Sequence, residues 1–534
     1  MSKHTKHPKL FEPVTFILTV VTAVLGAIIG IQIVTTLGVT PNTSIIGALV
    51  AMLVARIPLM IFKKYKSVHR QNLIQTSISS GTFGAANSLL IPIGIPFVMG
   101  ETQLIIPMLI GAALAMFVDA TILYKIYDSP LFPAKEAWPP GVAAAESIKA
   151  GDSGGKRAGL LGIGALIGLG GSFAGISMSA FGVAFIGNIF ALLMFGIGLM
   201  LRQYSIPWFD VDVNALYIPH GIMVGAGIVA LIQVAVLIFK KPKKTVKEGK
   251  MESLGEEEAA ATTSTIEQAR KTLGFGFIAY LVIALLIALI GGLITEMSVG
   301  MIIAFMVYAA FAAFVHELIV GIAAMHSGWF PAFAVAFITL IVGLLIGFPP
   351  TALALLAGFS AATGPAFADM GYDLKSGYIL RGFGQDEEFE REGRRQQFFT
   401  AALAFGVALI VVILTYQSYF EQNLVPPIDT VYASTIQAGA TPEVAKSLLL
   451  WAIPGALIQL IGGPNRQMGI MLATGLLILT PNACWAVLGG LAIRGIVLKW
   501  KGKEAEAPMS IMAAGFIAGD ALYSFFSSVF SARK

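Results

Sequence analysis

The sequence predicts an all-α polytopic membrane protein. Of its 534 residues, 56% are hydrophobic and only 12% are charged, whereas charged residues approach a quarter of a soluble domain. The mean hydropathy is +0.81. Apolar stretches long enough for a spanning helix, which needs about 20 residues, recur from residue 14 to residue 530. This composition excludes a soluble protein and predicts about 15 to 17 transmembrane segments.

The apolar stretches can be placed in order along the chain. In the first part we expect spans at residues 14–40, 42–62, 72–99, 103–124, 157–179, 183–200 and 217–239. In the second part we expect them at residues 268–294, 298–325, 330–348, 351–370, 398–420, 443–462, 467–498 and 509–530. The first stretch lacks the small-residue cleavage site of a signal peptide, so it is predicted to be a true span.

The charged residues indicate topology and domain organisation. The net charge of +5 comes with basic residues clustered at segment ends, as in cytoplasmic loops, which argues against nucleic-acid binding. Residues 240–272 alternate lysine and glutamate blocks and are predicted to be a polar cytoplasmic linker. They separate a first membrane repeat, residues 1–239, from a second, residues 273–534. We expect a multi-pass protein of the cell membrane with a cytoplasmic N-terminus.

Two pairs of stretches resemble each other at nearly one spacing, which indicates two related halves. The stretch around Ile148 resembles the stretch around Ile436, 288 residues later, and that around Ile222 resembles that around Ile511, 289 residues later. By our count the copies are an odd number of crossings apart, so the repeats are expected to be inverted. Inverted repeats with broken or re-entrant helices at the midplane recur among transporters.

Residues 131–150 are predicted to enter the membrane. Lysine-rich loops at residues 63–70 and after residue 239 should lie on one side, so an even number of crossings must separate them, and only five spans are clear. The small residues and prolines of 131–150 suit a short or broken helix that supplies the sixth crossing.

The stretch "GDSGGKRAG" from Gly151 invites comparison with a phosphate-binding loop. A Walker A loop places Ser or Thr after the lysine because the hydroxyl holds magnesium. Here the glycine spacing is one residue short and Arg157 occupies the hydroxyl position. Nucleotide binding is therefore not expected, and no cofactor is predicted. The single cysteine, Cys484, excludes an internal disulfide and a cysteine-based metal site.

Three otherwise apolar segments carry polar side chains that membrane depth tolerates only where protein or water supplies partners. One surrounds Glu146, and the other two contribute Gln75, Thr76, Ser79, Ser80 and Asn87, and Thr363, Asp369, Asp373 and Lys375. Close helix packing explains any single serine. Three such segments together favour a transport pathway, in which Ser79–Gly84 and Ala361–Gly364 are predicted to meet near the midplane.

Intramembrane ionisable residues give further candidates. A carboxylate at the bilayer centre costs roughly 2.5–3.5 kcal/mol on insertion scales, so it must be neutral, paired or in contact with water. The acids that are candidates for proton coupling on this ground are Asp119, Glu146, Glu317, Asp369 and Asp520. His316 and His326 are ten residues apart, which places no ligand pair on one helix face, so no metal site is expected. Arg466 is either a bidentate ligand for a substrate carboxylate or an interfacial anchor.

Several stretches resemble, in order along the chain, motifs of the oligopeptide transporter family, which includes peptide carriers and yellow-stripe-like carriers of metal chelates. They are "NLIQTSISSG", "AAAESIKAG", "MHSGWFPAF", "YDLKSGYIL" and "GGPNRQMGIMLATGLLIL". The long hydrophilic N-terminal arm of many eukaryotic members is missing, which indicates a prokaryotic-type member. The resemblance implies a proton-driven secondary carrier, and it marks Glu146, Lys149, Asp373, Lys375, Tyr378, Arg466 and Gln467 as functional positions.

The leading hypothesis is a proton-coupled importer of short oligopeptides or peptide-like metal chelates, with the lipid bilayer as a partner and a homo-oligomer as an option. Glu146 is expected to bind substrate or protons, made tolerable by water, Lys149, Lys375 or Arg466. An exporter, a carrier of another small solute and a channel remain alternatives. An enzyme is not expected, since "VHELIVG" lacks the second histidine of a zinc-protease motif.

Overall fold

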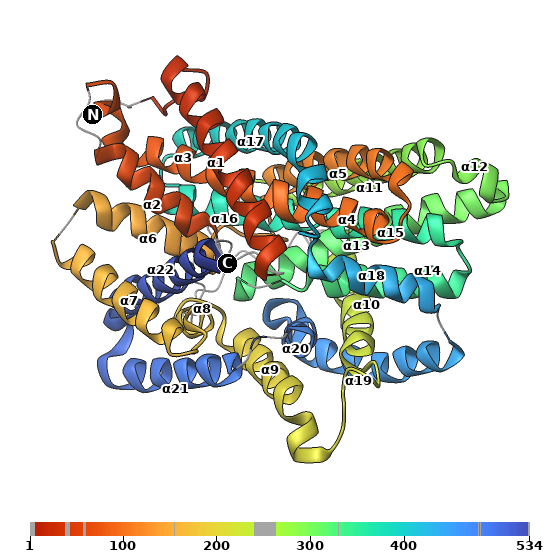
Figure 1. Cartoon of the computed structure of the whole chain (residues 1–534). Coiled ribbons are helices and arrows are strands. Elements are labelled where there is room, and N and C mark those ends of the chain that lie inside the picture. Colours follow the sequence, from red (N-terminus) through yellow and green to blue (C-terminus); the bar gives the residue numbers. More distant parts are fainter. Residues whose placement is uncertain are drawn as a thin grey trace, which may run out of the picture.

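The computed structural model describes residues 6–37, 43–56, 60–153, 155–239, 263–328, 330–439, 441–478, 480 and 482–531. Every regular element in this part of the chain is a helix, which confirms the all-α class (Figure 1). Residues 240–262 of the predicted linker 240–272 lie outside the described residues, and α11 begins within the rest of it, at Ile266.

The first part of the chain contains helices α1 to α10. Their bounds are α1 Pro13–Leu37, α2 Thr43–Arg56, η1 Met60–Lys66, α3 Val68–Phe83, η2 Gly84–Leu90, α4 Ile91–Val98, η3 Thr102–Leu104, α5 Ile105–Ile126, α6 Pro139–Ser153, α7 Gly155–Phe173, α8 Met178–Val183, α9 Ile189–Phe209 and α10 Ile218–Phe239. Here η2 is π-helical, whereas η1 and η3 are 3₁₀-helices.

The second part of the chain contains helices α11 to α22. Their bounds are α11 Ile266–Ile290, α12 Leu293–Glu296, α13 Val299–Ser327, α14 Ala332–Ile346, α15 Pro350–Ala362, α16 Pro365–Leu380, α17 Glu387–Glu421, α18 Pro427–Ala438, α19 Pro442–Arg466, α20 Met468–Leu477, α21 Ala483–Lys501, η4 Gly502–Ala505 and α22 Glu506–Ser531.

Ten helical segments in the described residues are long and apolar enough to cross a membrane. They are Pro13–Thr35, Val68–Val98, Thr102–Ile126, Ile189–Phe209, Ile266–Ile290, Val299–Ser327, Pro350–Leu380, Glu387–Glu421, Pro442–Pro464 and Ala483–Lys501. Outward-facing positions on these helices remain apolar: Phe275, Ile278 and Val282, at helical spacing on α11, are 61%, 59% and 60% exposed. Such a surface suits lipid, and together these features confirm a polytopic membrane protein.

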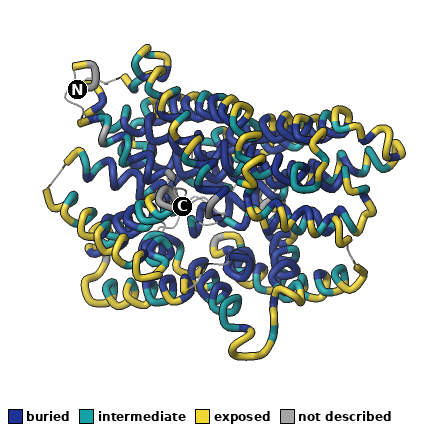
Figure 2. The backbone as a smooth tube through the Cα atoms, viewed as in Figure 1, coloured by how far each residue is buried: buried dark blue, intermediate teal, exposed yellow. Residues whose placement is uncertain are grey.

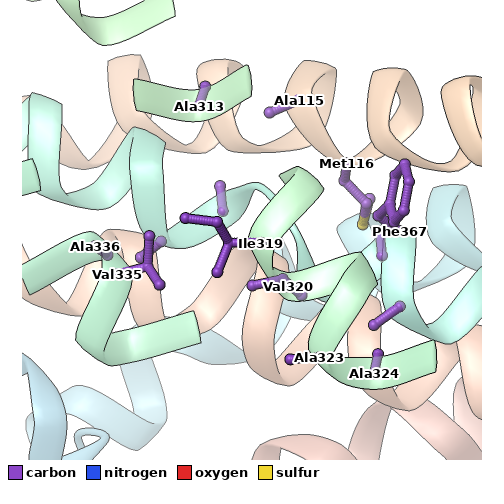
Figure 3. Packing of buried hydrophobic residues seen from close by; sticks show 14 of the residues in the cluster. Ala115, Met116, Ala313, Ile319, Val320, Ala323, Ala324, Val335, Ala336 and Phe367 are labelled. Carbon is purple, nitrogen blue, oxygen red and sulfur yellow. The ribbon is translucent and has the colours of Figure 1, made fainter. Parts of the chain in front are cut away.

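Small side chains let the central helices approach one another closely. Buried residues are concentrated in the centre of the molecule and exposed ones at its periphery (Figure 2). Within the main apolar cluster, α13 contributes Ala313, Ala323 and Ala324, which pack with residues of α5, α14 and α16 (Figure 3). This packing places the segment formed by α15 and α16, which is interrupted between them, against the continuous helices α5, α13 and α14.

One cavity is lined by Lys6, Lys9, Lys125, Lys271, Arg391, Arg394 and Arg395, and we call the end of the molecule that carries it the basic end. The N-terminal segment is anchored there, since the Leu10 amide donates to Gln396 Oε1 at 2.8 Å and Arg70 pairs with Glu12 at 2.6 Å. Thr263, the first described residue after residue 239, donates its hydroxyl to Asp128 at 2.7 Å. The N-terminus, the α5–α6 connection and the start of α11 therefore share one end.

Residues 131–150 enter the molecule from the basic end and return to it. The chain leaves that end at Asp128 and reaches α13 and the middle of α16. There the Trp138 amide donates to Met325 O of α13 at 2.8 Å, and the Trp138 ring packs against Tyr372 of α16. Helix α6 then runs back toward that end, since its Ile148 packs against Ile379 and Leu380, which directly precede Arg381. The segment is thus re-entrant, and the prediction of a sixth crossing was wrong. Its buried loop is short enough to be held by neighbouring side chains.

Candidate functional site

Two interrupted helical segments lie side by side in the centre of the molecule. Val68–Val98 and Pro350–Leu380 each contain 31 residues. They are the most buried of the ten candidate spans, since 78% and 94% of the residues in their most apolar stretches are buried. Hydrogen bonds join Asn72 to Ser376, Gln75 to Asp373 and Ser79 to Asp369. Because the partner number falls as the first number rises, α3 and α16 run antiparallel.

Both segments lose regular α-helical structure near their middle. In the first, η2 is a π-helical stretch at Gly84–Leu90. In the second, Thr363 is extended and Gly364 has φ +95°, after which α16 begins at Pro365. An added Cβ at Gly364 would lie 3.0 Å from Val320, so glycine suits this position both sterically and conformationally. Both interruptions expose backbone groups inside the protein.

The α3–α16 pair buries two carboxyl groups one helical turn apart, Asp369 and Asp373, both 0% exposed. Asp369 accepts from Ser79 Oγ at 2.5 Å and from Ser80 Oγ at 3.1 Å. Asp373 accepts from Gln75 Nε2 at 2.6 Å, and Ser80 Oγ lies 3.2 Å from its other oxygen. Since a hydroxyl carries one proton, Ser80 donates to only one of the two acids at a time.

A chain of polar contacts leads from these acids to the basic end. Gln397 Nε2 donates to Asp373 O at 2.6 Å and to Thr76 at 3.2 Å, and Arg381 donates to Gln397 Oε1 at 2.7 Å. Arg381 also pairs with Glu390 at 2.7 Å.

The Glu390 carboxylate bridges Arg381 to a second arginine, Arg394, at 2.8 Å, and Arg394 reaches Asp128 at 3.4 Å. We call Arg381, Glu390 and Arg394 the arginine–glutamate cluster.

A cavity of about 980 Å³ opens at the basic end next to this cluster. Its lining combines the N-terminal segment, the end of α5 and the starts of α11 and α17. Its charged members are Lys6, Lys9, Lys125, Lys271, Asp386, Glu388, Arg391, Glu392, Arg394 and Arg395. Arg394 belongs to both the cavity wall and the arginine–glutamate cluster. The polar chain therefore connects an open vestibule with the buried acids.

Lys375 and Tyr378, predicted beside Asp373, take other roles. Residues two apart on a helix face different sides, and Lys375 Nζ points away to donate to Ala134 O at 2.8 Å and Glu136 O at 2.7 Å. It thereby holds the re-entrant loop. Tyr378 is half-buried, with its ring 5.6 Å from Lys375 Nζ.

Glu146 of α6 is buried, but its partners come from α6 itself and from the next helix, α7. Arg157 of α7 donates to it from Nε at 3.0 Å and also from Nη2, and Lys149 Nζ lies at 3.7 Å. Lys149 was a predicted partner, whereas Arg157 was considered only as a departure from a phosphate-binding loop. None of the hydrogen bonds described for Glu146 reaches α3 or α16.

Arg466 and Gln467 form the turn between α19 and α20. Gln467 has φ +47°, and its Oε1 accepts from Gln459 at 2.7 Å, while Gln459 Oε1 receives the amides of Gly469 and Ile470. Arg466 is exposed with its guanidinium 4.3 Å from the Phe190 ring centre. This motif shapes a helix start, and its described contacts do not join the α3–α16 pair.

Thr363 and Asn87 lie at the two helix interruptions. Thr363 Oγ1 donates to Ser360 O at 2.9 Å, and Asn87 lies within η2. The predicted meeting of Ser79–Gly84 with Ala361–Gly364 is close to what is observed, with Ser79 on Asp369 and η2 packed against α15 and α16. The described residues contain no group of three or more histidine, cysteine or acidic side chains suited to a metal ion.

Sequence reasoning missed Gln397, Tyr280 and the arginine–glutamate cluster. Gln397 and the cluster lie within residues 381–397, whose many charged side chains are typical of a solvated loop. Only the spacing of Glu390, Arg394 and Gln397 on one long helix hinted at burial. Tyr280 stands alone in an apolar helix, and its hydroxyl lies within hydrogen-bond distance of both Asp119 and Glu317, which were predicted candidates.

Comparison with known proteins gives one result for most of the chain. The sequence model of the family described as OPT oligopeptide transporter protein matches residues 13–240 and 211–531. A search of curated proteins finds no match.

Proposed function

The chain belongs to the OPT oligopeptide transporter family, and we propose that it imports short oligopeptides or peptide-like metal chelates by secondary active transport coupled to protons. Family membership makes it an oligopeptide-type transporter with a small-molecule substrate and residence in a membrane. The substrate class, direction and proton coupling are the proposal. A transporter family also gives no reason to assign an enzymatic activity.

The observation that carries the proposal is the pair Asp369 and Asp373 at the centre of the molecule. Both are fully buried, and their hydrogen-bond donors are the neutral side chains of Ser79, Ser80 and Gln75. None of the ion pairs within the described residues includes either acid. A buried carboxylate without a cation is costly, so this pair favours a proton or a cationic group of the substrate.

The interruptions beside these acids supply a second part of a binding site. The break at Thr363 and Gly364 leaves backbone groups without α-helical partners, and η2 lies against both α15 and α16. Broken helices of this kind present free backbone amides and carbonyls to substrates and ions in other transporters. A peptide or a chelate offers matching carboxylate, amide and amine groups.

We also propose that residues 1–239 and 273–534 are inverted repeats. Helices α6 and α18 begin 288 residues apart, at residues 139 and 427, and α10 and α22 begin 288 apart, at residues 218 and 506. Helix α7 packs on α22 while α10 packs on α19, so each pair joins one helix from each half (Figure 1).

The orientation follows from the basic end. Cytoplasmic loops carry an excess of lysine and arginine, and the basic end contains Lys6, Lys9, Lys125 and Lys271 around its vestibule. We therefore place the basic end, and with it the N-terminus, in the cytoplasm of a cell membrane.

Flux into proteoliposomes tests the proposal. Vesicles containing the protein receive labelled di- to pentapeptides or iron and nickel chelates, with and without an imposed inward proton gradient. We expect accumulation above the outside concentration with the gradient, and its loss when an uncoupler is added. Equilibration without dependence on the gradient would indicate a channel or facilitator, and no flux of either substrate class would contradict the substrate proposal.

A further inference from the structure

A second buried acid pair lies at the start of α16. Asp119 of α5, Tyr280 of α11 and Glu317 of α13 are each 0% exposed. The Tyr280 hydroxyl lies 2.5 Å from Asp119 Oδ1 and 2.5 Å from Glu317 Oε2. We call these three residues the acid–tyrosine triad.

The triad requires a proton beyond the one on the phenol. A tyrosine hydroxyl carries a single hydrogen and can donate to only one carboxylate. The other contact of 2.5 Å joins two oxygens, so its hydrogen must come from the second carboxyl group. Contacts as short as this are typical of charge-assisted O–H···O⁻ hydrogen bonds. The geometry therefore corresponds to one protonated acid, one phenol and one carboxylate in a row.

The surroundings assign the proton to Glu317. Asp119 Oδ2 accepts the backbone amide of Gly364 at 2.5 Å, at the N-terminus of α16, where a negative charge is stabilised. Glu317 Oε1, by contrast, is buried and makes no hydrogen bond. An ionised carboxylate would lose more by this than the carbonyl oxygen of a protonated one. Glu317 is thus the acid and Asp119 the carboxylate.

Other titratable groups on the elements around the triad are engaged elsewhere. His316 of α13 contacts the Ser360 carbonyl of α15, and Asp369 of α16 accepts from the two serines of α3. Tyr372 of α16 donates to Gly328 O at 3.0 Å. Glu390 and Arg394 of α17 pair with each other at the basic end.

We propose that Glu317 is a proton-binding site, distinct from Asp369 and Asp373, which couples proton occupancy to the position of α16. Release of its proton leaves two buried negative charges on either side of one phenol, a state that a movement of the Gly364 amide or an incoming cation must relieve. Since α16 also carries Asp369 and Asp373, the two sites share one moving element. The coupling role rests on the proposed function, whereas the presence of the proton does not.

Infrared difference spectroscopy on the full-length protein in lipid vesicles tests the protonation. The wild type should show the carbonyl band of a protonated carboxylic acid at neutral pH. Glu317→Gln should lose one component of this band, separate from any that Asp369 or Asp373 contributes, and Glu421→Gln, at an exposed glutamate, should keep that component. Tyr280→Phe should keep the band but shift it, because a hydrogen-bond partner is lost. A Glu317→Gln spectrum with the same band as the wild type would overturn the assignment.

Transport of the peptide or chelate that the wild type accumulates tests the coupling role. Glu317→Gln should lose gradient-driven accumulation while keeping exchange of labelled for unlabelled substrate, which also shows that the variant is folded. Wild-type accumulation, or equal loss of both activities while Tyr280→Phe retains both, would overturn the role. If the wild type transports nothing, the proposed function fails, and the infrared result still decides the proton site.

Discussion

Helix α16 and the residues that follow it bury acidic side chains in two contrasting ways. Asp369 and Asp373 have neutral donors, whereas Glu390 lies between two arginines, Arg381 and Arg394. Glu390 and the two arginines form ion pairs with one another, so no further ligand is needed to balance the Glu390 charge. A bound cation would stabilise the ionised form of the acids whose partners are neutral. The comparison teaches that burial alone does not mark a functional acid, and we expect the charge of its partners to separate a structural role from the proposed transport role.

Removing an arginine from the paired region should have the largest effect. Arg381→Ala leaves Glu390 buried with Arg394 as its remaining guanidinium, and breaking a buried ion pair costs about 3–5 kcal/mol. Thermal unfolding in detergent should show a large loss of stability. Arg391→Ala, at a 62% exposed arginine paired with Glu387, is the matched control and should change stability little. Equal effects of the two variants would contradict the structural role.

A substitution at the helix break should disturb the unpaired region. Gly364→Ala places a side chain at φ +95° and against Val320, and strained backbone positions cost about 1–3 kcal/mol. The start of α16 should shift, so substrate affinity should fall more than stability does. Gly406→Ala, at a helical glycine with open space around it, is the control for both measurements. Wild-type affinity in Gly364→Ala would show that the break is not needed.

The basic end should respond to pH through His7. Burial and the nearby Arg381 charge lower the pKa of His7 from 6.5 to about 3. Between these values the unfolded segment binds a proton that the folded one does not, so stability falls as the pH drops below 6.5 and is complete above it. Hydrogen exchange of the N-terminal segment should show a loss of about 1.4 kcal/mol per pH unit at most. His7→Phe should reduce this pH dependence, and an unchanged profile would contradict it.

An ion pair at the edge should have the smallest effect. Glu146 is buried, but Arg157 is 39% exposed, so the pair should contribute no more than about 1 kcal/mol to stability. A double-mutant cycle with Glu146→Gln and Arg157→Gln measures this coupling directly. Because the described contacts of Glu146 do not reach the α3–α16 pair, Glu146→Gln should retain both accumulation and exchange. Loss of exchange would return Glu146 to the substrate site, where the sequence had placed it.

The sequence predicted the fold class and the kinds of residues at the site better than their partners. Apolar run length and composition set the helices, and the polar segments at Ser79 and Asp369 stood out because charge is costly at membrane depth. Partners such as Gln397 and Tyr280 come from helices distant in sequence, and a single residue in an apolar helix carries no periodic signal. Lys375 was predicted at the site because it shares a short motif with Asp373, but the motif does not show that the two side chains face different sides of α16.

Substrate binding to variants of the two central acids tests the account most directly. Equilibrium binding of the labelled peptide or chelate that the wild type accumulates is measured for Asp369→Asn and Asp373→Asn, with Asp210→Asn, at an exposed aspartate, as the control. We predict a loss of affinity of roughly tenfold to a hundredfold for the central variants, the value of a hydrogen bond to a charged group, at near wild-type thermal stability. Wild-type affinity in both central variants would contradict the assignment of the binding site to the α3–α16 pair.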